Sequence, residues 1–144
     1  MTREELIARL EKAPKGSDEM DAHILAYFVG DGALVAQSRF NGAWCVYKGT
    51  NRAGEPRLWE PDYRDKVRTK LPWSQSLDAA LTLVPEHHSY ELTQSAVEPP
   101  RFARARLWDW RRSPTGFDPG NEWKSEGNRP LTIAVCSAAL KAGA

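Results

Sequence analysis

The sequence predicts an α+β fold in which one mostly antiparallel sheet carries helices on both faces, a three-layer α-β-α sandwich. The length of 144 residues suits a single domain over residues 1–144. Hydrophobic residues make up 41% of the chain and charged residues 27%, which is typical of a chain that folds around a core. Segments with strand-like alternation are mixed irregularly with segments of helical periodicity, and this mixture favours the α+β class.

The chain begins with two expected helices. Thr2 and Glu5 form a capping box, which predicts a first helix that ends by Pro14. Ser17 can cap a second helix, and Gly30 ends it. Apolar residues of this second helix recur at the spacing of one helical face: Met20, Ile24, Tyr27 and Phe28.

The next region is expected to form strands. The Asn41-Gly42 turn signal precedes residues 43–47, which are rich in aromatic and branched side chains and predict a strand. Residues 57–59 are its expected partner strand. Residues 62–70 carry many charges and almost nothing to bury, so we expect an exposed, mobile connection there.

The remaining elements follow from the same two periodicities. Apolar spacing predicts a helix over residues 77–84 and a largely buried closing helix over residues 131–140. Residues 90–93 and 101–110 alternate and predict two strands. The stretch 113–128 is rich in Gly, Pro and polar residues, which indicates a long loop.

Three separated segments resemble the family of small proteins that carry a phage ABA sandwich domain. They are the N-terminal helices over residues 5–24, the Ser-Leu-Asp-Ala-Ala-Leu-Thr-Leu-Val-Pro stretch over residues 76–85, and the Ala-rich closing segment over residues 131–140. The middle of the chain does not align to the family pattern. The resemblance implies a three-layer arrangement and an origin in a phage or prophage, and it supplies no catalytic residues.

The segment Arg101–Arg112 is the most unusual part of the sequence, with five arginines against one aspartate and hence a local charge of +4. An extended strand would place Ala103, Ala105 and Leu107 on one face. The opposite face, which we call the Arg/Trp face, would carry Phe102, Arg104, Arg106, Trp108 and Trp110.

Three interpretations of the Arg/Trp face are open. Trp and Arg are enriched at the hot spots of protein interfaces, so the face can bind a protein partner. Guanidinium groups beside aromatic rings also suit phosphate recognition and base stacking, so Arg104, Arg106 and Trp108 can hold a nucleotide. Finally, Arg and Trp side chains can stack on each other as an ordinary sheet surface.

Charge and hydropathy exclude several classes of partner. The chain has a net charge of +1, and residues 1–31 hold four basic and seven acidic residues, so we do not expect it to bind duplex nucleic acid. No apolar run is long enough to cross a membrane, and no signal peptide is expected, which favours a cytoplasmic protein. Cys45 and Cys136 are expected to be buried thiols, because their separation does not describe a disulfide framework.

Metal and cofactor chemistry finds little support in the sequence. His87 and His88 are adjacent, so in a strand they point to opposite faces, and His23 is remote from them. A nuclease-type carboxylate pair would need Asp62 and Glu122, which are far apart in the chain. We expect no cofactor and no metal.

These observations predict a non-enzymatic protein that binds a host protein, or a second copy of itself, through the Arg/Trp face, and the resemblance implies that it is a phage or prophage accessory protein. The alternative is a binder that sequesters a nucleotide or another phosphorylated small molecule. A metal-dependent nuclease is the third and least supported hypothesis.

Overall fold

The computed structural model describes residues 1–61, 69–95, 102–114, 118 and 120–144. The elements in chain order are α1 (Arg3–Lys12), α2 (Asp18–Val29), β1 (Leu34–Gln37), β2 (Trp44–Thr50), β3 (Pro56–Leu58), α3 (Leu77–Leu81), β4 (His88–Gln94), β5 (Ala103–Asp109), β6 (Trp123–Gly127) and α4 (Leu131–Lys141).

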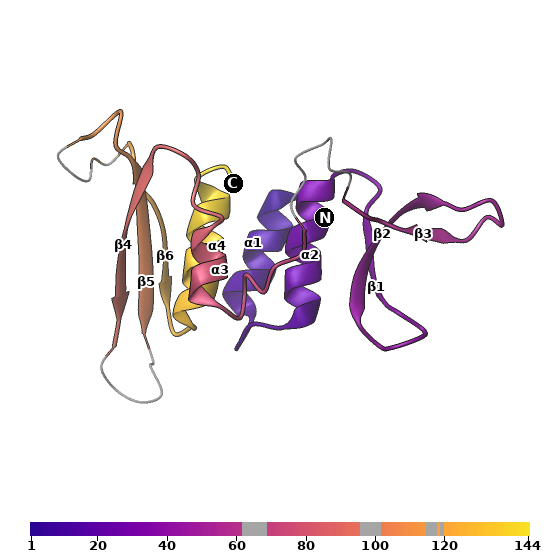
Figure 1. Ribbon diagram of the computed structural model, residues 1–144. Coiled ribbons are helices and arrows are strands. Elements are labelled where there is room, and N and C mark those ends of the chain that lie inside the picture. The colour runs from indigo at the N-terminus through magenta and orange to yellow at the C-terminus, as the bar shows by residue number, and fades with distance from the viewer. Residues whose placement is uncertain (62–68, 96–101, 115–117, 119) are drawn as a thin grey trace.

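The strands form two antiparallel sheets of three strands each. Sheet A has the order β1-β2-β3 and sheet B has the order β4-β5-β6. The helices lie between the sheets: α2 packs on sheet A, α4 packs on sheet B, and α1 lies between α2 and α4 (Figure 1). The α+β class and the antiparallel pairing are confirmed, and all the helices and both sheets contribute to one core.

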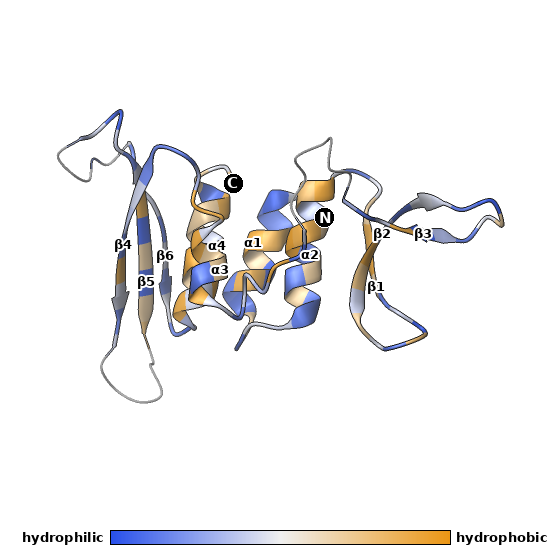
Figure 2. Cartoon of the chain, in the orientation of Figure 1, coloured by the Kyte–Doolittle hydropathy of each residue, from blue (hydrophilic) through white to orange (hydrophobic). Residues whose placement is uncertain are grey.

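The order of the layers differs from the expected one. The prediction placed one sheet between helices, whereas the structure places the helices between two sheets. The reason is visible in β5, whose residues alternate between buried and half-buried, so that only one face of sheet B is apolar (Figure 2). A sheet covered by helices on both faces needs strands that are apolar on both faces.

Helix α4 provides the centre of the core. All residues from Ile133 to Leu140 are buried, as the two apolar stripes of this segment predict, and the helix contacts α1, α3 and every strand of sheet B. Leu6 and Leu10 of α1 are fully buried against it. The position of α4 between α1 and sheet B explains why it is apolar around most of its circumference.

The first two helices begin as expected. Thr2 Oγ1 accepts a hydrogen bond from the Glu5 amide at 3.2 Å, and the Glu5 carboxylate accepts from the Thr2 amide at 2.7 Å. Ser17 Oγ accepts from the Met20 amide at 3.1 Å. Gly30 ends α2 with a φ of 101°, in the region that favours glycine.

A buried polar junction joins the start of α2 to the segment before α3. The carboxylate of Asp21 is 1% exposed and accepts hydrogen bonds from the Ser74 amide at 2.6 Å and from Gln75 Nε2 at 2.8 Å. Gly16 lies so close to this segment that a β-carbon there would lie 1.8 Å from the Ser74 carbonyl oxygen. Glycine is therefore required at position 16.

Three segments differ from the prediction. Residues 123–127, expected in a long loop, form strand β6. The prediction missed this strand because neighbouring Gly and Pro residues indicate a loop and obscure the alternation around buried Ser125. Strand β1 was not predicted, and α3 is shorter than the expected helix over residues 77–84. The expected connection over residues 62–70 lies almost entirely outside the described residues.

No helix in the described part of the chain is long and apolar enough to span a bilayer.

Candidate functional site

Strand β5 places its side chains on two distinct faces, as the sequence predicts. Ala103, Ala105 and Leu107 are fully buried on the inner face of sheet B, toward α4. Arg104 and Arg106 alternate with them on the outer face, which no described element covers. Trp108 also lies on this face and is half-buried. The extended conformation on which the Arg/Trp face depends is therefore present.

The outer face also carries acidic residues from the flanking strands. Glu91 of β4 lies opposite Arg106, and Glu126 of β6 lies opposite Arg104. Arg106 Nε donates to Glu122 Oε1 at 2.8 Å, and Arg106 Nη1 lies 3.6 Å from Glu91 Oε1. Residues directly opposite each other in a sheet are close enough for such pairing.

These acids neutralise the face. Among the described residues, three basic and three acidic side chains share it, so their formal charges cancel: Arg104, Arg106, Lys124, Glu91, Glu122 and Glu126. On this face of the described strands, Arg104 and Arg106 therefore do not form a free positive patch. Arg101, which contributes to the local charge of +4 along the sequence, lies outside the described residues.

The two arginines are held with different strength. Arg106 has a close ion pair, whereas Arg104 Nη2 lies 3.7 Å from Glu91 Oε1, and Arg104 Nε is buried without a hydrogen-bond partner in the described part of the chain. Their side chains are 32% exposed for Arg104 and 23% for Arg106. Arg104 is therefore the guanidinium more free to reorient toward a partner.

Exposed aromatic rings mark both ends of the face. Phe102 precedes β5 and is 39% exposed, and Trp110 follows β5 and is 46% exposed. The Trp110 ring meets the His87 ring edge-on, with centroids 5.5 Å apart. His87 has a φ of 66°, and its carbonyl oxygen accepts from the Trp110 amide at 3.0 Å, which fixes the end of the β4-β5 pair.

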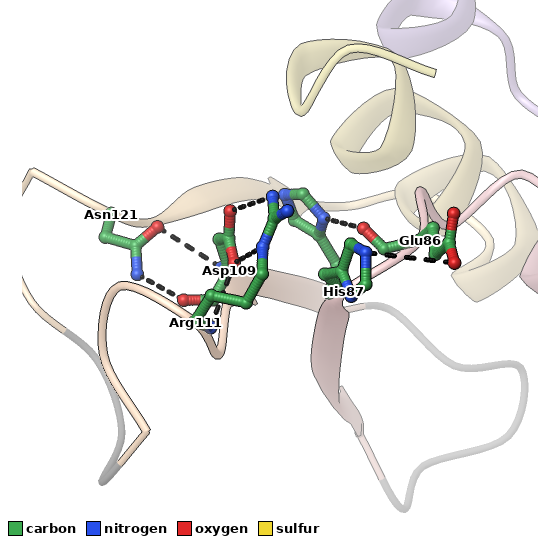
Figure 3. Close-up of polar contacts among 6 residues, drawn as sticks. Glu86, His87, Asp109, Arg111 and Asn121 are labelled. Atoms are coloured by element: carbon green, nitrogen blue, oxygen red, sulfur yellow. Dashed lines mark hydrogen bonds and ion pairs between the residues drawn. The ribbon is translucent and has the colours of Figure 1, made fainter.

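A polar cluster at the end of β5 engages another arginine of the segment (Figure 3). Asp109 accepts from Arg111 Nε at 3.1 Å and from Arg111 Nη2 at 2.9 Å, and this bidentate hydrogen bonding lowers the pKa of Asp109 to about 2. Asn121 is 1% exposed and ties the loop to β5 by donating to the Asp109 carbonyl at 2.8 Å and accepting from its amide at 3.2 Å. Arg111 is thus a structural residue.

The histidines serve local packing. The ring of His88 packs against Trp123, with centroids 5.2 Å apart, and its Nδ1 lies 3.0 Å from the Glu86 carbonyl oxygen. His23 lies on α2, with Nε2 3.0 Å from Arg9 Nη1. No group of three or more His, Cys, Asp or Glu residues in the described ranges is arranged to hold a metal ion.

The two cysteines and the two carboxylates considered for a nuclease site, Asp62 and Glu122, lie in four separate places in the chain. Cys136 is a buried thiol, as predicted, and burial raises its pKa, whereas Cys45 is only half-buried. Both thiols are free. The carboxylate of Glu122 is engaged by Arg106, and Asp62 lies outside the described residues.

Sequence reasoning identified the basic half of the outer face and missed its acidic half. Glu91 lies in a predicted strand, and Glu122 and Glu126 lie in a stretch predicted as loop. The signal that could have found them is the antiparallel register, which depends on recognising β6 as a strand.

Comparisons with known proteins give no relative from which a role could be taken. No protein-family model, curated protein or solved structure matches the chain. The resemblance to the phage ABA sandwich family therefore stays a prediction.

Proposed function

We propose that this protein acts without catalysis, by binding another protein through the Arg/Trp face. The carrying observation is the pair of exposed rings, Phe102 and Trp110, at the two ends of a solvent-facing strand that presents guanidinium groups between them. Aromatic residues and arginine are enriched at interface hot spots. The cancelled charge of the face supports a protein partner better than a polyanion.

The proposed partner is a host-cell protein, and the proposed origin of the chain is a phage or prophage. Both statements rest on the resemblance of residues 5–24, 76–85 and 131–140 to the phage ABA sandwich family. The Arg/Trp face lies outside those segments, so it is the part of the molecule where binding specificity can differ from relatives of the same fold.

The alternative is a protein that sequesters a nucleotide or another phosphorylated small molecule. Such a ligand would use Arg104, Arg106 and Trp108, and its phosphate would have to displace the carboxylates of Glu91 and Glu122 from the two guanidinium groups. This competition makes the alternative weaker. The hypothesis of a metal-dependent nuclease has still less support, because the Glu122 carboxylate that would bind the metal already forms an ion pair with Arg106.

The test begins with capture of partners from a bacterial lysate and continues with the purified partner. We expect Trp110→Ala to weaken binding about tenfold or more, as loss of a hot-spot residue does. Arg104→Ala should weaken binding less. Tyr90→Ala is the matched control, because Tyr90 is also 46% exposed but lies opposite Leu107, on the other face of sheet B. An unchanged dissociation constant for both Trp110→Ala and Arg104→Ala would contradict the proposal.

Thermal unfolding with a panel of nucleotides distinguishes the nucleotide-binding alternative from the proposed protein binding. A ligand present at 100 times its dissociation constant stabilises a protein by about 2.7 kcal/mol. We expect no such shift. A stabilisation that disappears in Arg104→Ala would instead favour the nucleotide binder.

A further inference from the structure

The outer face of sheet A is apolar, and none of the described helices and strands covers it. Leu34, Tyr47 and Leu58 form one row across its three strands, because Tyr47 lies opposite Leu34 of β1 and Leu58 of β3. Leu34 is 62% exposed and Leu58 is 47% exposed. The opposite face carries Val46, which is 3% exposed and packs toward α2. The outer row therefore has no partner among the described elements.

A groove lies over part of this apolar row: Leu34 and Tyr47 line it, and Leu58 lies beyond it. It encloses about 420 Å³ and is bordered by the β1-β2 turn and by the start of β3. The sheet bends here, because the register between β2 and β3 shifts between Tyr47 and Thr50, and the β2-β3 hairpin projects away from the helices (Figure 1). Phe40, in the β1-β2 turn, lines the groove and is 100% exposed. An apolar surface of this kind marks an interaction site.

The two ends of the groove carry opposite charges. Arg39 comes from the β1-β2 turn, and Glu55 comes from the β2-β3 turn, and both line the groove. Both side chains are exposed, and neither forms an ion pair with a residue in the described ranges. A partner with the reverse order of charges would pair with both.

We propose that this face binds a second copy of the chain. A two-fold axis through the middle of the groove exchanges its ends, so Arg39 of each copy meets Glu55 of the other, and the same surface serves both copies. Phe40 of each copy then enters the groove of the other, beside Tyr47 and Pro56. The Phe40 ring, the groove and the two charged side chains all lie on one surface, and such a surface can be complementary to itself, as an isologous interface requires.

This dimer leaves the Arg/Trp face free. The outer face of sheet B lies on the far side of the helices from sheet A (Figure 1). A dimer formed through sheet A would present two Arg/Trp faces at its opposite ends, and two linked binding faces can raise the avidity for a multivalent partner.

Sedimentation of the full chain over a range of concentrations tests the proposal. We expect a monomer–dimer equilibrium whose dissociation constant rises about tenfold or more in Arg39→Glu and in Glu55→Arg, because each change places like charges together twice in the dimer. The double variant Arg39→Glu with Glu55→Arg should restore the dimer. Phe40→Ser should weaken it at least as much as either single charge reversal.

Arg52→Glu provides the matched control. Arg52 is exposed in the same β2-β3 turn as Glu55 but does not line the groove, so the same change of charge should leave the dimer intact. Circular dichroism of each variant checks that the fold is retained. We expect it to be retained, because the substituted side chains are exposed and do not pack in the core. Arg104→Ala should leave the dimer unchanged and so separates this inference from the proposed role of the Arg/Trp face.

Several results would overturn the inference. These are a wild-type protein that stays monomeric at all concentrations, a dimer that survives Phe40→Ser, and a charge-swapped double variant that fails to recover.

Discussion

The two sheets solve the problem of an exposed face in opposite ways. Sheet B covers its outer face with charged side chains that pair with one another, such as Arg106 with Glu122 at 2.8 Å. Sheet A leaves Leu34 and Leu58 exposed, and Arg39 and Glu55 at its groove form no ion pair with a residue in the described ranges. Their inner faces differ less, because each packs on a helix of the central layer.

This difference shows that local sequence charge is a poor guide to surface charge. Arg104 and Arg106 of β5 lie on a face whose formal charges cancel among the described residues, because the neighbouring chain segments supply acids at or next to the matching register positions. The exposed apolar groove, in contrast, lies in a region whose local sequence carries no charge cluster that would mark it as a binding surface. Each sheet therefore presents a different type of surface to a partner.

The largest expected effect compares one substitution in the two sheets. Leu107→Ala in β5 removes a fully buried side chain and should lower the free energy of unfolding by about 2–5 kcal/mol. Leu58→Ala in β3 removes a side chain that is 47% exposed and should change it by about 0.5 kcal/mol or less. Urea unfolding, at a concentration where the chain is monomeric, measures both. Equal losses would show that the two sheets do not differ in this way.

A smaller effect is expected for the ion pairs of sheet B. A double-mutant cycle with Arg106→Ala and Glu122→Ala should give a coupling energy of about 1 kcal/mol, because both side chains are less than a quarter exposed and form a direct hydrogen bond. Arg57 of β3 is the control: Arg57→Ala combined with Glu122→Ala should be additive. Additivity in the Arg106 cycle as well would mean that the face is not held by this pair.

The smallest effect at neutral pH is expected at the end of β5. The pKa of Asp109 is lowered from 3.8 to about 2 by its hydrogen bonds from Arg111, so the carboxylate stabilises the folded state above pH 4. That stabilisation is lost as the pH falls from about 4 toward 2. Asp109→Asn removes this titration and should make the free energy of unfolding less dependent on pH in that window, measured by urea unfolding at several pH values.

Some acid sensitivity should remain in Asp109→Asn. Burial tends to raise the pKa of Glu11, but its hydrogen bonds from Lys141 and Ser137 outweigh burial, and the net pKa is lowered. Glu11 therefore also loses a stabilising charge in acid. An identical pH profile for the wild type and Asp109→Asn would contradict the role assigned to Asp109.

Much of the fold could be predicted from local sequence signals. Thr2 and Ser17 cap helices, and the alternation around Ala105 is a strand, because each signal acts over a few residues. The layer order could not be found in this way, since it depends on which faces meet across the core. The acidic partners of Arg106 were missed for the same reason: Glu91 and Glu122 are separated from it in sequence and are brought to it by strand pairing.

The place of α4 has a consequence for synthesis of the chain. Residues 131–141 fill the space between α1 and sheet B, yet they follow every other element in the order of translation. Until they leave the ribosome, Leu6, Leu10 and Leu107 have no neighbour on that side. We therefore expect the earlier elements to stay incompletely packed until α4 has been synthesised, with exposed apolar surface that promotes aggregation during that interval.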